Sequence, residues 1–166
     1  DTIFAGAVAA NTDSARLNDN NYNQVVGGNG SDILYGSANK DIFIYEARNG
    51  ADLMLETGNT ASTRDYIYNL SQGDRITFAD NAKLQFLGNG STNASSVNAG
   101  DFGLSIRYDK VTNAELWNGT TGAATRVSID IAKADGTFDN LADAMIVLVG
   151  TDIDIRVEGN SIFYGA

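Results

Sequence analysis

Oxygen donors dominate among the side chains of this chain that could do chemistry. The 166 residues include no cysteine and no histidine, which excludes a thiolate nucleophile, a Ser-His-Asp relay and a zinc site built from nitrogen and sulfur ligands. The chain is rich in Asp, Asn and Gly instead. Carboxylates, amides and backbone carbonyls are the ligands that hard cations such as Ca²⁺ prefer, so the residue types favour cation binding over nucleophilic catalysis.

These oxygen-bearing residues recur with a spacing of nine between Asn18 and Tyr45. Three blocks, NDNNYNQVV, GGNGSDILY and GSANKDIFI, each place turn-forming residues before two or three β-formers. Asn23, Asp32 and Asp41 occupy the same position in the three blocks. Glycine adopts positive φ at little cost, and β-branched and aromatic residues suit short strands. The spacing therefore predicts a tight coil of turns and strands.

The middle block, Gly27 to Tyr35, fits the pattern G-G-x-G-x-D-x-U-x at every fixed position, where U is a large apolar residue. That pattern is the calcium-binding nonapeptide of RTX (repeats-in-toxin) proteins. Residues 18 to 45 thus resemble the RTX domains of secreted proteases, lipases, adhesins, surface-layer proteins and alginate epimerases. Asn replaces Asp at position 23, and Gly36-Ser37 and Asn39 replace the later glycines. These departures suggest one or two calcium ions and a terminal piece of a roll.

The resemblance implies a parallel β-roll with calcium between stacked loops. Loops 18 residues apart stack, so Asn23 pairs with Asp41, whereas Asp32 on the opposite edge needs partners near Ser14 or near residues 50–52. Backbone carbonyls and carboxylates would supply six or more oxygens, and metal binding would be coupled to folding. The expected calcium ligands are Asn23, Gly27, Asn29, Asp32, Gly36, Ala38, Asp41 and Asp52.

Beyond the blocks, strand-like runs alternate with turn signals. We expect an all-β fold: a short parallel β-roll that continues into an antiparallel β-sandwich-like region. Within one domain, an N-terminal arm or first strand covers residues 1–17, the roll covers 18–53, and a β-rich region covers 54–166. A short helix is expected at Asp139 to Ala144. The later strands are expected in DLMLE, DYIYNLSQGDRITF and KLQFL, and at residues 103–108, 126–132, 144–151, 154–157 and 161–164.

Simpler interpretations compete with the calcium interpretation. Residues 27–35 also suit a hairpin loop between ordinary strands, and residues 18–23 suit a solvated polar loop. Asp130, Asp135 and Asp139 lack the residue order of an EF-hand, which favours turn carboxylates.

Two further sets of residues invite a binding or catalytic interpretation that we disfavour. An acidic pair such as Asp130 and Glu158 offers general acid–base catalysis, but any acidic β protein contains such pairs. Several aromatic side chains could stack on sugar rings, although their spacing favours packing within the protein. These aromatic residues are Tyr66, Tyr68, Tyr108, Trp117 and Tyr164.

Charge and hydropathy restrict the partners. The formal net charge is −10, which disfavours nucleic acid. The longest apolar run, Ala144 to Gly150, falls short of the roughly 20 residues of a membrane span.

We expect a non-enzymatic, secreted or cell-surface module, exported by type I secretion, that binds Ca²⁺ and folds outside the cell. It would take part in a surface layer, filament or adhesin through self-association or contact with cell-surface polysaccharide. The alternative is a carbohydrate-binding or secretion and stability module of a larger RTX enzyme, and an enzyme in its own right is a weaker third option.

Overall fold

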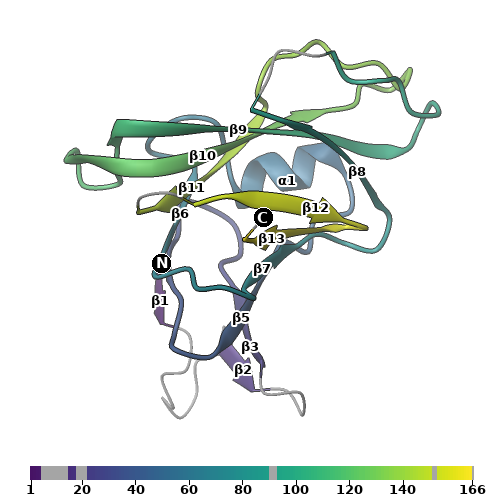
Figure 1. Cartoon of the computed structure of the whole chain (residues 1–166). Coiled ribbons are helices and arrows are strands. Elements are labelled where there is room, and N and C mark those ends of the chain that lie inside the picture. Colours follow the sequence, from purple (N-terminus) through teal and green to yellow (C-terminus); the bar gives the residue numbers. More distant parts are fainter. Residues whose placement is uncertain (5–14, 18–21, 90–92, 151–152, 166) are drawn as a thin grey trace.

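Two mixed β-sheets build most of the molecule (Figure 1). The computed structural model describes residues 1–4, 15–17, 22–89, 93–150 and 153–165. In those residues the sheets have seven and six strands and are accompanied by one short helix. The expectation of a mainly β protein is confirmed.

The strand order follows from the hydrogen-bonded pairs. The first sheet has the order β1 (Thr2–Phe4), β4 (Ile33–Tyr35), β6 (Asp65–Tyr68), β11 (Ala144–Val149), β10 (Thr121–Ile131), β9 (Phe102–Glu115), β8 (Ala82–Gly88). The second sheet has the order β12 (Ile155–Glu158), β13 (Ser161–Tyr164), β7 (Arg75–Thr77), β5 (Lys40–Ile44), β3 (Tyr22–Val26), β2 (Ala15–Leu17).

From β3 to β7 the chain crosses between the two sheets after every strand. Strands β3, β5 and β7 pair in parallel in the second sheet, and β4 and β6 pair in parallel in the first. Residues nine apart in the blocks therefore lie on opposite sheets, whereas Asn23 and Asp41 are direct neighbours on β3 and β5. The three blocks form β3, β4 and β5. The alternation continues to Thr77, past residue 53, where we expected the coil to end.

Helix α1 (Gly50–Glu56) is inserted between β5 and β6. Its N-cap is Asn49, whose side-chain oxygen accepts a hydrogen bond from the Asp52 backbone N–H at 2.9 Å. Leu53 is its buried residue. The expected strand at DLMLE was wrong, because an N-cap followed by Ala, Leu and Met favours a helix that needs only one buried side chain. Helix α1 is the one helix of the described residues, and its seven residues are too few to cross a membrane.

The short helix expected at Asp139 to Ala144 does not form. Residues 139–143 make bends and Ala144 begins β11. Asn140 has φ of 64°, a left-handed conformation that a right-handed helix cannot contain.

The C-terminal part contains the expected strands, but its sheets are mixed and not purely antiparallel. Strands β9, β10 and β11 are antiparallel neighbours, whereas β8 pairs in parallel with β9 and β6 pairs in parallel with β11. The hairpin of β12 and β13 returns to the second sheet, where β13 lies beside β7. The alternating strands and the C-terminal strands are therefore joined within both sheets. Residue 151, at the end of one expected strand, lies outside the described residues.

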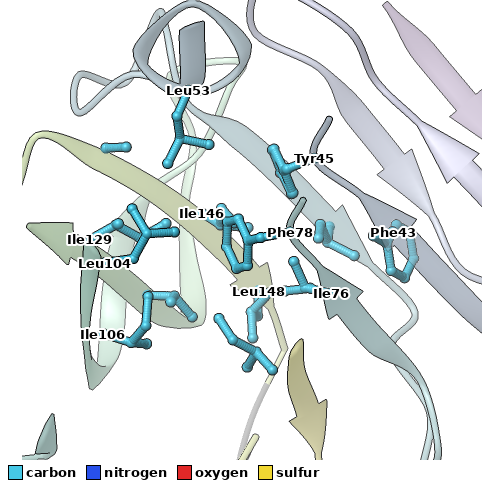
Figure 2. Packing of buried hydrophobic residues seen from close by; sticks show 14 of the residues in the cluster. Phe43, Tyr45, Leu53, Ile76, Phe78, Leu104, Ile106, Ile129, Ile146 and Leu148 are labelled. Atoms are coloured by element: carbon cyan, nitrogen blue, oxygen red, sulfur yellow. The ribbon is translucent and has the colours of Figure 1, made fainter. Parts of the chain in front are cut away.

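Side chains from both sheets meet in one hydrophobic core (Figure 2). Phe43 and Ile76 come from the second sheet, and Ile67, Leu104 and Ile146 come from the first; each is at most 2% exposed. Successive side chains on a strand point to opposite faces, so each short strand of the coil contributes one or two residues to this core. Burial of one such side chain stabilises the fold by about 1.5–3 kcal/mol. The core thereby fixes the strand ends that carry the polar site.

Candidate functional site

Acidic and amide residues at the starts of the alternating strands form two columns, one on each sheet. Every member stands two positions before a buried apolar residue of the core. The Asp32 column, on the first sheet, consists of Asp1, Asp32 and Asp65. The Asp41 column, on the second sheet, consists of Asn23, Asp41 and Asp74.

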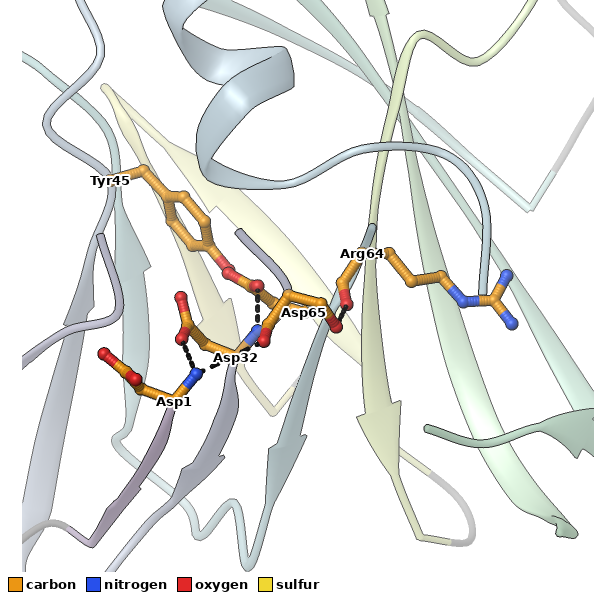
Figure 3. Close-up of polar contacts among 6 residues, drawn as sticks. Asp1, Asp32, Tyr45, Arg64 and Asp65 are labelled. Atoms are coloured by element: carbon orange, nitrogen blue, oxygen red, sulfur yellow. Dashed lines mark hydrogen bonds and ion pairs between the residues drawn. The ribbon is translucent and has the colours of Figure 1, made fainter. Parts of the chain in front are cut away.

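Both columns are connected by the same backbone-to-carboxylate hydrogen bond. The Asp32 backbone N–H donates to Asp65 Oδ1 at 2.8 Å, and the Asp41 backbone N–H donates to Asp74 Oδ1 at 2.9 Å. In the Asp32 column the amino nitrogen of Asp1 lies 2.6 Å from Asp32 Oδ1 (Figure 3). One role of these carboxylates is therefore to accept backbone donors at the point where each strand begins.

In the Asp41 column, protein donors occupy the carboxylates of Asp41 and Asp74. Asp41 Oδ1 accepts from Asn23 Nδ2 at 2.7 Å and from Ser37 Oγ at 3.1 Å, and its Oδ2 accepts from the Ser37 backbone N–H at 2.5 Å. Asp74 Oδ2 accepts from the Ser71 backbone N–H at 2.7 Å and from Ser71 Oγ at 3.2 Å. The structure thus brings Asn23 and Asp41 together as expected, but through a direct amide–carboxylate hydrogen bond.

Asp32 differs from Asp41 although it occupies the same position of the repeat. Its side chain is 1% exposed, and Oδ2 is buried without a hydrogen-bond partner. This oxygen faces Gly27 of its own loop, where a Cβ would lie 2.7 Å from it. Gly28 and Gly30, with φ of 84° and 114°, take backbone conformations that favour glycine. A buried carboxylate oxygen without a donor is costly. The Asp1 amino group pairs with Oδ1 of this carboxylate, so Oδ2 is the oxygen that could bind a proton or a further cation.

Further carboxyl groups are buried near Asp32. Asp65 is 1% exposed, and its Oδ2 accepts a hydrogen bond from the Tyr45 hydroxyl at 2.8 Å. Burial, reinforced by the charges of Asp32 and Glu56, raises the pKa of Asp65 to about 8. Burial also raises the pKa of Asp32 and of Glu56 above their ordinary values. Oε2 of Glu56 is a second buried oxygen without a partner.

The other expected ligands lie in turns or on the helix. Asn29 and Ala38 are exposed in the loops before β4 and β5. Gly36 is the counterpart of Gly27, and a Cβ there would lie 3.3 Å from Asp41 Oδ2. Asp52 belongs to the first turn of α1, where its Oδ2 accepts from Asn49 Nδ2 at 2.7 Å, and it is in neither column.

The residue below Asp32 in its column is therefore Asp65 and not Asp52. Asp65 and Asp74, together with Tyr45 and Glu56, were not predicted from the sequence as members of the site. A signal for the first two was present, because they are nine residues apart and each precedes an isoleucine by two positions. The insertion of α1 concealed it by separating Asp41 from Asp65 by 24 residues. Ser14, the other expected neighbour of Asp32, lies outside the described residues.

The remaining acidic residues have roles in turns or ion pairs. Asp135 Oδ1 accepts from the Thr137 backbone N–H and Asp139 Oδ1 from the Leu141 backbone N–H, each at 3.0 Å, which confirms their expected role as turn carboxylates. The same expectation was wrong for Asp130, which lies on β10 of the first sheet and is 5% exposed. Glu158 lies on β12 of the second sheet.

The aromatic residues largely pack within the protein, as expected. Tyr66 is fully buried, and Tyr68 stacks on Tyr35 with ring centroids 4.9 Å apart. Tyr108 stacks on Phe86 with centroids 5.9 Å apart. Trp117 is the exception, since 48% of it is exposed.

Side chains alone do not complete a metal site here. Over the described ranges, no three Asp, Glu, His or Cys side chains are arranged to hold a metal ion. A cation beside Asp32 would therefore need backbone carbonyls as most of its ligands. Comparisons of the chain with protein-family models, with curated proteins and with solved structures find no match. A function must therefore be inferred from the residues of this chain.

Proposed function

We propose that this chain is a calcium-binding structural module of the RTX kind, with one Ca²⁺ bound in the loop that ends at Asp32. The observation that carries the proposal is the buried, partnerless Oδ2 of Asp32. It lies in the loop whose sequence, GGNGSD, fits the nonapeptide pattern. In this proposal the alternating strands β3 to β7, with β1, form a short parallel β-roll.

The donors near Asp32 suit a hard cation. Calcium takes six to eight oxygens, which carboxylates and backbone carbonyls supply. Asp32 would provide the carboxylate, the Gly27 and Asn29 carbonyls would come from the same loop, and the stacked loop that ends at Asp65 would provide the rest. Bound calcium would neutralise carboxylates whose burial otherwise favours protonation. The Asp41 column is not proposed as a second site, because Asn23, Ser37 and Ser71 already donate to its carboxylates.

A structural role outside the cell follows from this chemistry. Extracellular modules bind calcium with Kd of about 10⁻⁴ to 10⁻³ M, so the site would be empty in the cytoplasm and filled after export. The chain has a net charge of −10 and contains no cysteine. Such a chain suits folding that is driven by cation binding and not by disulfide formation. We further propose that the folded module is part of a surface layer, filament or adhesin.

A carbohydrate-binding or secretion module of a larger RTX enzyme is the alternative. In its favour, Phe4, Tyr35 and Tyr68 form a row of rings with centroids 4.5 Å and 4.9 Å apart. Stacking on a sugar, however, uses an open ring face. Both faces of Tyr35 are covered by its neighbours in the row, which leaves Phe4 at the end of the row, 54% exposed, as the ring best placed to stack. The assembly role is therefore preferred. Calcium-dependent affinity for alginate or another acidic polysaccharide would favour the alternative, and calcium-induced polymers seen by electron microscopy would favour assembly.

The test compares two carboxylates at equivalent positions of the repeat. Calcium is titrated by calorimetry into chelator-treated full chain, wild type, Asp32→Asn and Asp41→Asn. We expect one ion per wild-type chain, loss of binding in Asp32→Asn, and retained binding in Asp41→Asn despite lower thermal stability. Binding by Asp32→Asn with wild-type affinity, or no binding by the wild type, would refute the proposal.

A further inference from the structure

A cleft of about 400 Å³ lies between helix α1 and the strand ends at which β9 begins and β10 ends. Pockets that bind small molecules have volumes of about 300–1,000 Å³. None of the described residues that line the cleft belongs to the Asp32 column or the Asp41 column. The cleft is therefore a candidate binding site that is separate from the proposed calcium site.

The walls of the cleft are held in place by close packing and hydrogen bonds. A Cβ at Gly50 would lie 2.5 Å from Ile131 Cγ2, so the helix and β10 approach each other closely at this glycine. Asn81 Nδ2 donates to the Arg48 carbonyl at 2.9 Å. The Ile131 backbone N–H donates to Asp143 Oδ2, also at 2.9 Å. Because these contacts form the cleft in advance, a ligand would order few groups on binding.

One part of the lining is apolar. Phe102 and Ile131 form it from the strands, and Met54 forms it from the helix. Phe102 is buried and Ile131 half-buried, whereas Met54 is 46% exposed. Covering this apolar surface would favour binding. A ligand that suits the cleft therefore has an apolar face.

Charged side chains of both signs line the rest of the cleft. They are Arg48, Lys133, Asp101, Asp139 and Asp143. Arg48 Nη1 lies 2.9 Å from Asp80 Oδ1, and Lys133 Nζ lies 3.3 Å from Asp139 Oδ2. Each of these cations thus has a carboxylate beside it, and an anionic ligand would also approach a chain with a net charge of −10. The cleft therefore favours a ligand without net charge over an anion.

We propose that this cleft binds one unit of a neutral saccharide. The C–H face of a sugar ring would pack on Phe102 and Met54, and the hydroxyl groups would bond to the charged side chains. A hydroxyl both donates and accepts, so it can join a carboxylate and a guanidinium without breaking an ion pair. An acidic sugar or a zwitterion would have to displace a carboxylate from Arg48 or Lys133. A fully apolar ligand would leave the charged groups without water or a partner.

The experiment follows the amide resonances of the full, isotope-labelled chain by NMR at saturating calcium. The neutral probes are cellobiose, maltose, galactose, mannose and N-acetylglucosamine, and the comparison probes are galacturonate and leucine. At least one neutral sugar should bind with Kd on the order of 1–10 mM and shift amides of residues 48–51 and 131–133. Galacturonate and leucine should bind at least about tenfold more weakly than that sugar.

Three variants test the location. Ala51→Trp places a large side chain in the cleft from an exposed helix position, and Kd should rise at least about tenfold. Leu55→Trp is the matched control, because Leu55 lies on the same helix, is 59% exposed and is not part of the lining; Kd should stay within about twofold of wild type. Asp139→Asn should raise Kd about fivefold to tenfold, since a charged acceptor becomes a neutral one. Circular dichroism confirms that each variant is folded.

The outcomes separate this inference from the proposed function. It is overturned if no neutral sugar shifts these amides at about ten times the expected Kd, if folded Ala51→Trp binds as wild type does, or if galacturonate or leucine binds best. A gain of galacturonate affinity in Asp139→Asn, without loss of neutral sugar, would likewise show an anion site. A chain that binds a neutral sugar but no calcium would refute the proposed function and leave this inference standing.

Discussion

Single residues decide whether both carboxylate oxygens of an aspartate in this repeat have hydrogen-bond donors. Asp32 and Asp41 occupy the same position of adjacent blocks, and each is at most 1% exposed. Asn23 and Ser37 supply donors to Asp41, whereas Asp32 Oδ2 has no donor. The sequence predicted both residues as calcium ligands in turns, but it could not reveal which carboxylate was already hydrogen-bonded, because that depends on the three-dimensional positions of donors such as Asn23 on β3.

Stability of the calcium-free protein should fall with rising pH. The pKa of Asp65 is about 8 in the folded state against 3.8 ordinarily. A raised folded-state pKa gives stability that is present below about pH 4 and lost as pH rises through 8. Chemical unfolding in chelator should therefore show a loss of up to about 1.4 kcal/mol per pH unit between pH 5 and 8. Saturating calcium should remove most of this slope, and a flat profile in chelator would contradict the assignment.

The contact between Gly27 and the Asp32 carboxylate provides a second test at the level of single residues. A Cβ at position 27 would lie 2.7 Å from Asp32 Oδ2, so Gly27→Ala must displace the carboxylate. We expect calcium affinity to fall at least about tenfold. Gly119→Ala is the control: its φ of 76° predicts a cost of about 1–2 kcal/mol, but no atom lies within 4 Å of the new Cβ, and calcium affinity should not change. Equal calcium affinity in both variants would contradict the proposed geometry.

At the scale of elements, local pattern predicted the strands of the coil but missed the helix inserted in it. The nine-residue spacing placed β3, β4 and β5 correctly and indicated that Asn23 and Asp41 are neighbours. Helix α1 breaks the spacing, and the pattern resumes unrecognised at Asp65 and Asp74. Asp65 and Asp74 were missed for that reason, and so was Glu56 at the end of the helix.

Capping of α1 should therefore affect stability. Asn49 accepts the Asp52 N–H at 2.9 Å, and loss of such a cap costs about 0.5–2 kcal/mol. Asn49→Ala should lower the free energy of unfolding by about that amount in denaturant titrations. Asn49→Asp, which keeps the acceptor, should stay close to wild type, whereas equal stability of all three proteins would show that the cap is dispensable.

At the scale of the whole molecule, one core joins the coil to the C-terminal strands. Phe43 and Ile67 of the coil and Ile106, Ile129 and Leu148 of the later strands belong to the same cluster. The parallel pairings of β6 with β11 and of β8 with β9 could not be predicted, because local patterns do not specify which distant strands pair. The strand-like runs and turn signals of the sequence, by contrast, correctly predicted the mainly β fold.

A shared core predicts cooperative unfolding of the whole chain. Far-ultraviolet circular dichroism and fluorescence of Trp117, on the turn after β9, should report the same midpoint, and calcium should shift both together. Phe43→Ala, at a fully buried position of β5, should lower the midpoints seen by both probes by the same amount. The shift should correspond to a loss of about 3–5 kcal/mol in the free energy of unfolding. Separate transitions would mean that the coil and the C-terminal strands unfold independently.

The most direct test of calcium binding at Asp32 is the anomalous diffraction signal of the ion in crystals grown at saturating calcium. We predict one peak at about 2.3–2.6 Å from Asp32 Oδ2, and no peak beside Asp41. Crystals in which Asp32 Oδ2 has no ion beside it at saturating calcium would contradict the account.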